Sequence, residues 1–328
     1  MSMPEVPHTM VPPSQKRPHI WKQGILQIHI TRACDLACFG CTQGSNLRGA
    51  PVMMSVAQFE QACLSLKDYF GVVGIFGGNP TLHPQFEEIC KVMKGIIPWE
   101  RRGLWSNNLS GKGKICKTTF NPRHSNLNVH LVREAYDEMY RDWPEARAEI
   151  KGLDPSWPEA KGRPAHIVGD SRHAPPYVAL KDVVEDRDER LRMIGNCDVN
   201  QNWSAMIGVF RGQLRAWFCE LAGAQSILHQ NNPDYPDTGL PVTPGWWNHP
   251  MAAYTEQVKK HCHECGIPLR GWGDLAVGGT TEQVSETHKD IYQPKRKDRL
   301  VQLVTHTDQL KMGALPKATD YIQNGSLS

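Results

Sequence analysis

The sequence lacks any long apolar run. No apolar run in its 328 residues approaches the roughly 18 residues that a membrane-spanning helix requires. The polar, proline-rich residues 1–17 contain no apolar signal core, and we expect residues 1–20 to form a flexible N-terminal arm. Repeats and low-complexity tracts are also lacking. The net charge of +3 is too small to indicate nucleic-acid binding by itself.

A disulfide framework is lacking as well. The sequence has ten cysteines, and seven of them fall into two sets with the spacing of metal ligands. We therefore expect metal binding in a reducing compartment, and a cytoplasmic protein without a membrane partner. Of the others, Cys63 and Cys90 lie on the apolar faces of predicted helices and are expected in the core. Cys116 is interpreted as an idle thiol.

The first cysteine set follows a short apolar segment. Residues 25–30 are suited to a buried strand, and Cys34, Cys38 and Cys41 come soon after it. Three thiolates spaced this closely can hold three irons of a 4Fe–4S cluster. The fourth iron then has no protein ligand nearby and can bind a substrate or cosubstrate. The spacing alone also allows a zinc knuckle or a chance cluster.

Two more strands are predicted to end in polar or glycine-rich turns. The strand at 72–76 runs into Gly77-Gly78-Asn79-Pro80, and the strand at 103–105 runs into Ser106-Asn107-Asn108. Paired glycines at a strand end let a ligand approach the backbone closely. Helix signals separate these strands, which predicts an α/β protein with a parallel sheet. We expect the cysteine loop and the glycine turn at the carboxyl edge of that sheet.

The middle of the chain is less regular. Its proline- and glycine-rich part is longer than a normal connection, which is typical of functional loops. From residue 126 onward we predict a fourth strand at 126–131 and a largely helical segment at 132–150. An irregular connection at 151–176, a fifth strand at 177–180 and a charged helix at 183–194 follow.

These motifs resemble those of the radical S-adenosylmethionine (SAM) superfamily. Its signature is C-x3-C-x2-C after the first barrel strand, and its GGEP motif matches the glycine turn, except that Asn79 replaces the glutamate. An amide oxygen still accepts a hydrogen bond from the SAM ammonium, but it brings no charge. The resemblance implies that the first cysteine set holds the catalytic cluster, and it implies SAM contacts at Phe39, Gly77, Gly78, Asn79, Pro80, Ser106 and Asn107.

The resemblance also implies a fold and a chemistry. It implies a partial (β/α)6 TIM-like barrel over residues 21–195, with SAM chelated by the open iron. A reducing electron donor such as flavodoxin or ferredoxin would supply electrons to the cluster. An electron from the cluster then cleaves SAM to methionine and a 5′-deoxyadenosyl radical, which abstracts a hydrogen atom from the substrate.

The second cysteine set contains Cys197, Cys219, Cys262 and Cys265, with 21, 42 and 2 residues between successive members. A β-hairpin with its turn at Gly212 is predicted between the first two. The set resembles the Twitch domain, the short form of the SPASM extension, which implies an auxiliary 4Fe–4S cluster. It implies a small C-terminal β-hairpin/helix domain at 196–280, followed by an extension at 281–328. Structural zinc with the same four thiolates is the rival interpretation.

A fully ligated cluster has no position for substrate and is suited to electron transfer. The resemblance to Twitch dehydrogenases of amino-sugar alcohols therefore favours oxidation of a small polar molecule such as a sugar alcohol, with the auxiliary cluster as electron acceptor. Radical modification or rearrangement of a nucleoside, a nucleic-acid base or a peptide is the alternative. The basic residues Lys295, Arg296, Lys297 and Arg299 mildly favour a nucleic-acid substrate. A zinc-binding adaptor is the non-enzyme alternative.

Overall fold

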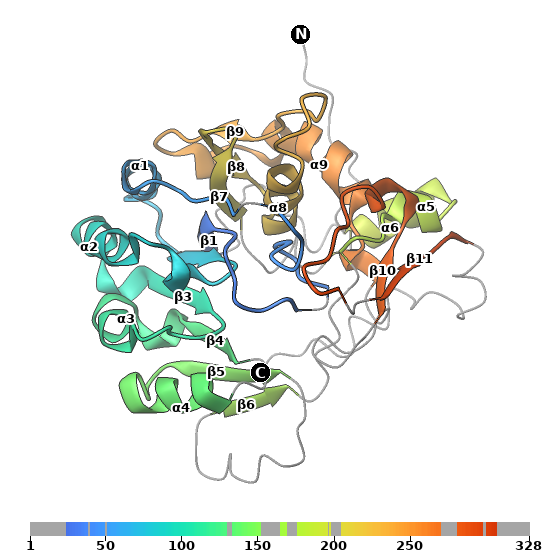
Figure 1. The fold of residues 1–328 in the computed structure, drawn as a ribbon. Helices are drawn as coiled ribbons and strands as arrows, with labels where there is room; N and C mark the ends of the chain where they lie inside the picture. Colours follow the sequence, from blue (N-terminus) through green and yellow to red (C-terminus); the bar gives the residue numbers. More distant parts are fainter. Residues whose placement is uncertain are drawn as a thin grey trace.

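A nine-stranded sheet organises the protein (Figure 1). The structure is a computed structural model and describes residues 24–38, 40–49, 51–129, 133–151, 165–168, 176–195, 197, 205–269, 281–297 and 300–306. The strands are β1 (Ile25–Thr31), β2 (Val72–Gly77), β3 (Arg102–Ser106), β4 (Asn126–Val129), β5 (Arg147–Lys151), β6 (Ala165–Val168), β7 (Ala205–Phe210), β8 (Gln213–Trp217) and β9 (Leu240–Pro241).

The strand order explains the shape of the sheet. It runs β6-β5-β4-β3-β2-β1-β7-β8-β9, and the first seven strands in that order are mutually parallel. β7 and β8 form an antiparallel hairpin, and β9 extends it. β6 and β9 lie at opposite ends of this order, so the described strands form an open parallel sheet, consistent with a partial barrel.

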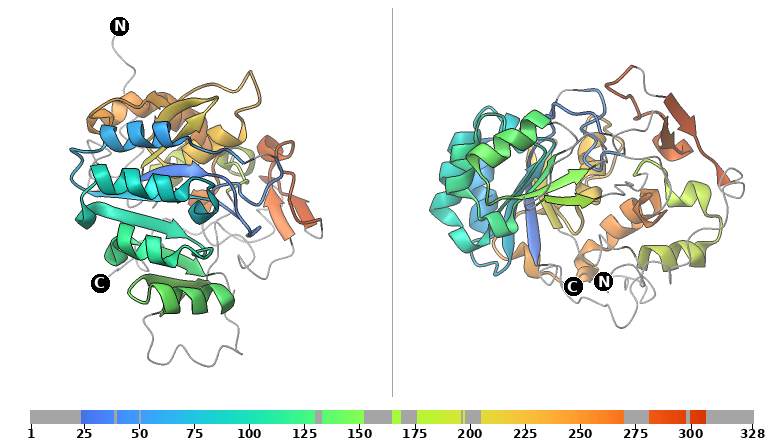
Figure 2. Two further views of the ribbon diagram at one scale, coloured as in Figure 1. Left: turned by 60° about the vertical axis from the view of Figure 1, so that its left-hand side comes forward. Right: turned by 90° about the horizontal axis from the view of Figure 1, so that it is seen from below.

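Helices cover the sheet on both sides. They are α1 (Val56–Ser65), α2 (Phe86–Ile96), α3 (Gly113–Thr119), α4 (Arg133–Asp142), α5 (Leu180–Val183), α6 (Arg187–Gly195), α8 (Glu220–Leu228) and α9 (Thr255–His261). Figures 1 and 2 show α1 to α4 stacked along one face of β1 to β6. β7 to β9 continue the sheet, while α5, α6 and a small separate sheet of β10 (Thr281–Val284) and β11 (Leu300–Leu303) lie on the other side.

Apolar and polar residues alternate along β1, which places its apolar residues on the face that packs with helix α1. Leu26, Ile28 and Ile30 are fully buried and belong to the same core cluster as Phe59 and Cys63 of α1. A capping box begins α1, because Ser55 Oγ accepts the Gln58 N–H at 3.2 Å and Gln58 Oε1 accepts the Ser55 N–H at 3.0 Å. The core positions expected for Cys63 and Cys90 are confirmed.

The sheet is continuous across the predicted domain boundary. β7, which follows that boundary, pairs directly with β1 from Leu26 to Ile28. One hydrophobic core includes Leu26 of β1, Trp217 of β8 and Val304 near the end of the described chain. The division into residues 21–195, 196–280 and 281–328 stays a prediction, and the arm at 1–20 lies outside the described residues.

The helix predicted over residues 132–150 is wrong in its second half. α4 ends at Asp142, Pro144 follows, and residues 147–150 belong to β5, which pairs with β4 from Asn126 to Val129. A proline disfavours the helical conformation of the residue before it, so the helix ends ahead of Pro144. The connection predicted at 151–176 contains a further strand, β6, which completes a set of six consecutive parallel strands.

The strand predicted at 177–180 is also wrong. Tyr177 lies in a turn and Leu180 begins α5. Tertiary contacts decide this conformation, because the Ala179 N–H donates to Ser285 Oγ at 2.8 Å instead of to a neighbouring strand. The charged helix predicted at 183–194 is present as α6 but begins later, at Arg187, where Asp186 Oδ1 accepts the Asp188 and Glu189 N–H groups.

Among the residues that the structure describes, no helix has both the length and the apolar character needed to cross a membrane.

Candidate functional site

Three adjacent strand ends bring the polar turns of the sequence together. β1, β2 and β3 are parallel neighbours, so their carboxyl ends meet at one edge of the sheet. The cysteine loop follows β1, the glycine turn follows β2, and Asn107 follows β3. Cys34, Cys38 and Cys41 are each partly exposed at this edge. Phe39, the remaining predicted SAM contact in this loop, lies outside the described residues.

The thiols of the cysteine loop favour a bound metal. Burial raises the pKa of Cys34 to about 12, and the neighbouring Cys41 thiol also raises it. The Leu36 N–H donates to Cys34 Sγ at 3.4 Å, which opposes this rise only in part. A thiolate at this position therefore needs a cationic partner, and iron in a cluster would supply one.

The cysteine loop is anchored by a segment far along the chain. The buried Glu282 carboxylate accepts the Gly40 N–H at 3.0 and 3.2 Å and the Tyr292 hydroxyl at 2.7 Å. The Tyr177 hydroxyl donates to the Cys41 carbonyl at 2.9 Å, and the Lys295 N–H donates to the Asn46 carbonyl at 2.8 Å. No motif in the sequence indicated the contacts to Gly40, Cys41 and Asn46, since each joins residues more than 100 positions apart.

Replacing Glu282 is expected to destabilise the protein through this anchor. In Glu282→Ala the buried Gly40 N–H and Tyr292 hydroxyl lose their acceptor, so the free energy of unfolding should fall by about 2–4 kcal/mol. Chemical denaturation of the metal-free protein measures this change. Glu256→Ala is the control, because Glu256 makes only an exposed ion pair with Lys259 and should change stability by less than about 0.5 kcal/mol. Equal effects of the two substitutions would contradict the anchor.

The glycine turn packs against the backbone of the cysteine loop. The Gly78 N–H donates to the Thr31 carbonyl at 2.8 Å, and the Asn79 N–H donates to the Ala33 carbonyl at 2.6 Å. A Cβ atom at Gly77, where φ is +151°, would lie 2.2 Å from the Thr31 oxygen, and one at Gly78 would lie 2.3 Å from the Ala33 oxygen. The close approach that these glycines permit is thus between two segments of protein backbone.

Gly78→Ala should displace the cysteine loop. The new Cβ would overlap the Ala33 carbonyl, so we expect the free energy of unfolding to fall by about 1–3 kcal/mol and the iron content after reconstitution to fall with it. Gly95→Ala is the matched control. Gly95 lies in α2, where an added Cβ would meet no neighbouring atom within 4 Å, so that substitution should stabilise the helix by about 0.5–1 kcal/mol. Unchanged stability and iron content in Gly78→Ala would refute this interpretation.

Asn79 is fully buried, and its side-chain oxygen is fully used inside the protein. Asn79 Oδ1 accepts hydrogen bonds from the Ser106 hydroxyl at 2.7 Å, the Thr81 hydroxyl at 2.7 Å and the Thr81 N–H at 3.2 Å. Pro80 follows as the first residue of a short 3-10 helix. Asn79 and Ser106 therefore hold the turn together, and the Asn79 oxygen has no exposed lone pair for a ligand.

An unpredicted residue, Asp35, lies at the centre of the strand-end cluster. Its carboxylate accepts the side-chain amides of Asn107 at 2.9 Å, Asn108 at 2.6 Å and Asn79 at 3.4 Å. Partial burial raises the pKa of Asp35, but the hydrogen bonds from Asn107 and Asn108 outweigh it and hold the pKa below its ordinary value. An acidic residue directly after the first cysteine was the one available sequence signal.

The cluster also contains an unused acceptor. Asn107 points its amide nitrogen at Asp35, while its Oδ1 is buried and has no hydrogen-bond partner. Buried polar atoms in folded proteins are normally paired, so an orphaned acceptor marks a place where a ligand donor or water belongs. The strand-end edge thus fits a polar ligand such as SAM next to the cysteine loop.

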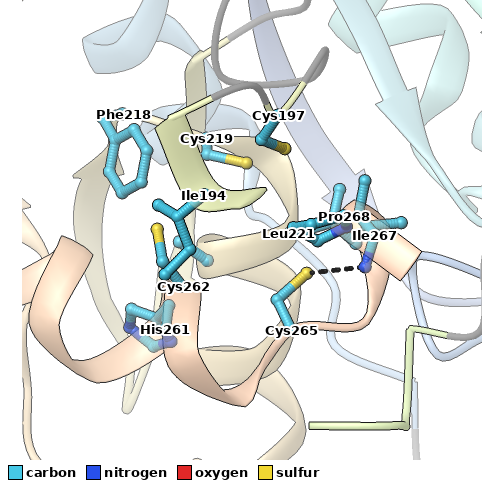
Figure 3. Close-up of a pocket in the computed structure, with 11 residues that line it drawn as sticks. Ile194, Cys197, Phe218, Cys219, Leu221, His261, Cys262, Cys265, Ile267 and Pro268 are labelled. Carbon is cyan, nitrogen blue, oxygen red and sulfur yellow. Dashed lines mark hydrogen bonds between the residues drawn. The ribbon is translucent and has the colours of Figure 1, made fainter. Parts of the chain in front are cut away.

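The second cysteine set surrounds one apolar cavity (Figure 3). Cys197 follows α6, Cys219 precedes α8, and Cys262 and Cys265 lie in the turn after α9. The cavity is lined by all four cysteines together with Ile194, Phe218, Leu221, Ala222, His261, Ile267 and Pro268. Burial raises the pKa of Cys265 to about 12, with a further rise from the Cys197 thiol, and it also raises the pKa values of Cys219 and Cys262.

Polar contacts fix the turn that carries two of these thiols. Glu264, between Cys262 and Cys265, pairs with Lys181 at 2.7 Å and with Lys260 at 2.9 Å. Both nitrogens of His261 have partners, Gln225 Oε1 at 3.1 Å on one side and Thr238 Oγ1 at 2.9 Å on the other. His261 is therefore committed to the protein, and the four thiols line the cavity as candidate ligands.

A polar pocket of ≈ 380 Å³ lies beside the cysteine loop on the β7 side. It is lined by Arg32, Leu47, Arg48, Gly49, Pro51, Val52, Val209, Gly212, Ile227, Leu228, Gln230, Asn231 and Ile291. Its volume is in the range of small-molecule sites. Arg32 is nearly fully buried and donates to the Gly44 carbonyl at 3.2 Å, so its guanidinium is held in a fixed position.

The comparisons with known proteins agree with this strand-end site. Residues 28–146, which contain the cysteine loop and the glycine turn, match the model of the Radical SAM superfamily. The matched segment is that of a radical SAM enzyme, and a 4Fe–4S cluster and SAM are the cofactors of that superfamily.

Two solved structures of BtrN are similar to the chain at low sequence identity. The structure of BtrN in complex with AdoMet and 2-DOIA is 15% identical, with a TM-score of 0.40, covering 78% of this chain and 92% of BtrN. The structure of BtrN in an open conformation is 13% identical, with a TM-score of 0.32, covering 78% and 91%. No curated protein matches the chain.

Proposed function

We propose that the protein is a radical SAM dehydrogenase of a small polar molecule such as a sugar alcohol. The substrate carbon would give a hydrogen atom to the radical that SAM cleavage supplies, and the substrate would then give one electron to the auxiliary site and one hydroxyl proton to solvent to become a carbonyl compound. The observation that carries this proposal is the cavity lined by Cys197, Cys219, Cys262 and Cys265, which offers a place for the departing electron.

The residues of the strand-end edge have distinct roles in this proposal. Cys34, Cys38 and Cys41 would hold the SAM-binding cluster, which supplies the electron that cleaves SAM. Gly77 and Gly78 keep the glycine turn close to the cysteine loop, and Asn79 and Ser106 lock that turn. Glu282 holds the loop from its other side. These residues would hold the reacting groups in one geometry.

The arrangement of the four thiols at the second site favours an iron–sulfur cluster over a single zinc ion. In a tetrahedral zinc site the Zn–S distance of about 2.3 Å places neighbouring sulfurs about 3.8 Å apart. Among the described residues, no three histidine, cysteine or acidic side chains lie close enough together to hold one metal ion. The four thiols instead line a shared cavity, which suits a multi-iron cluster with a sulfur ligand at each corner.

The pocket at Arg32 supports a small polar substrate. It lies on the β7 side of the cysteine loop, while the polar strand-end cluster lies on the β2 side. A substrate there would lie against the segment that carries Arg32 and Arg48, next to the loop of the first cysteine set. Arg32 and Arg48 would hydrogen-bond to hydroxyl or anionic groups of the substrate.

A substrate with a phosphate group is the second candidate. The exposed residues 295–297 are basic, and the Lys295 backbone is tied to Asn46 in the segment just after the cysteine loop. Positive charge beside the site would attract a nucleotide or nucleic acid. Strong salt dependence of substrate binding would favour this candidate, and a weak dependence would favour an uncharged sugar alcohol.

Iron analysis with EPR spectroscopy tests the two-cluster proposal. Protein reconstituted without air should contain about eight irons and eight sulfides per chain, and its EPR signal should change when SAM is added. About four irons with the same response to SAM would leave a radical SAM enzyme without the auxiliary cluster, and the argument for dehydrogenation would then fail. A colourless, zinc-containing protein would favour the adaptor alternative.

A further inference from the structure

The strand-end cluster lacks a negative charge at the expected position but has one nearby. Asn79 occupies the place of the glutamate that the superfamily motif carries, and the oxygen of Asn79 already accepts three hydrogen bonds. It can therefore offer an ammonium group neither a charge nor a lone pair. The same side chain donates its amide group to the Asp35 carboxylate at 3.4 Å.

Asp35 is held in a fixed orientation by its neighbours. Asn107 and Asn108 donate to its two different carboxylate oxygens at 2.9 and 2.6 Å. The Asp35 side chain is nevertheless exposed, so part of its carboxylate faces open space at the carboxyl edge of the sheet. No lysine or arginine side chain forms an ion pair with it among the contacts of the described residues.

A second acceptor lies next to this carboxylate. Because the Asn107 amide nitrogen is turned toward Asp35, its Oδ1 points elsewhere, and that buried oxygen has no partner. One charged and one neutral acceptor, held together by the Asn107 amide, form a suitable receptor for the several N–H donors of an ammonium group.

We propose that Asp35, together with Asn107 Oδ1, receives the amino group of SAM and supplies the negative charge that Asn79 lacks. This inference rests on the proposed function, because it assumes that SAM binds at the first cysteine set. Asn79 then acts as a positioning residue, since it fixes Asp35 and the turn without touching the ligand. The acceptor is thereby carried by the cysteine loop itself, directly beside Cys34.

Anaerobic equilibrium dialysis with SAM tests this assignment in reconstituted protein of verified iron content. Asp35→Asn removes the charge but keeps the size of the side chain, and the dissociation constant of SAM should rise roughly 10- to 100-fold. A SAM analogue with hydrogen in place of the amino group should bind Asp35→Asn and the unaltered protein equally. Asp68→Asn, an exposed change just before β2 at the other edge of the sheet, should leave both dissociation constants unchanged.

An exchange variant separates charge from loop structure. Asp35→Asn combined with Asn107→Asp keeps one hydrogen bond and one carboxylate in the pair, so it should recover most of the lost SAM affinity. An unchanged SAM dissociation constant in Asp35→Asn, an equal loss for SAM and the amino-free analogue, or no recovery in the exchange variant would each overturn the inference. Failure of the unaltered, iron-loaded protein to bind SAM would instead overturn the proposed function.

Discussion

Cys34→Ala should abolish reductive cleavage of SAM. With dithionite as reductant, formation of 5′-deoxyadenosine is expected to fall by more than about 100-fold, because even changes that only support metal ligands cost about 10- to 100-fold. Burial raises the pKa of the Cys34 thiol, so the free thiol is neutral and gains its ligand character only with bound metal. Two remaining thiols, Cys38 and Cys41, leave an open cluster with too few ligands to persist.

The control for this experiment is another cysteine of the same half of the protein. Cys116 is a fully buried core residue of α3, outside both cysteine sets, so Cys116→Ala removes a thiol without removing a predicted ligand. It should retain both iron and SAM cleavage. Substantial 5′-deoxyadenosine formation by Cys34→Ala, with normal folding, would refute the assignment of the first set.

Much of the site-bearing half of the fold follows from the sequence. The strands at 25–30, 72–76 and 103–105 were predictable, because each is a short apolar segment ended by a turn signal. The hairpin of β7 and β8 was predictable from its turn at Gly212, which has a φ of +78°. Local patterns of this kind set the strand ends, and the parallel arrangement then brings those ends to one edge of the sheet.

The parts that escaped prediction depend on distant contacts. Tyrosine is a common residue in strands. The ring of Tyr177, however, packs against the ring of Tyr292 with 5.0 Å between the ring centres, and its hydroxyl donates to the Cys41 carbonyl. The role of Glu282 depends on a partner 242 positions away. Neither contact leaves a periodic signal, so propensity and spacing could not indicate them.

Asp35 illustrates a different limit of sequence reasoning. Its position beside Cys34 was visible, but its importance depends on three asparagine side chains from two other strand ends. Asn79 was predicted as a direct SAM acceptor, and only the hydrogen bonds from Ser106 and Thr81 reveal that its oxygen is occupied. The sequence thus locates the edge of the site, while the direction of each hydrogen bond requires coordinates.

Cys262→Ala should disable the second cysteine set without affecting the first. This residue lies on the cavity between α8 and α9, whereas the first set lies after β1, so the two losses should be independent. We expect the iron content to fall from about eight to about four per chain, with SAM-dependent 5′-deoxyadenosine formation retained within a few fold. Oxidation of the substrate should be lost, because the electron that leaves the substrate then has no acceptor.

The matched control for Cys262→Ala is Cys90→Ala, which removes a core thiol of α2 and should leave about eight irons in place. Two results would contradict the auxiliary site. An unchanged iron content would show that Cys262 holds no cluster, and loss of SAM cleavage in a folded protein would show that the two sets act as one unit. Retained SAM cleavage with half the iron instead assigns the second set to electron transfer, because a closed cluster offers no position where substrate or SAM can bind.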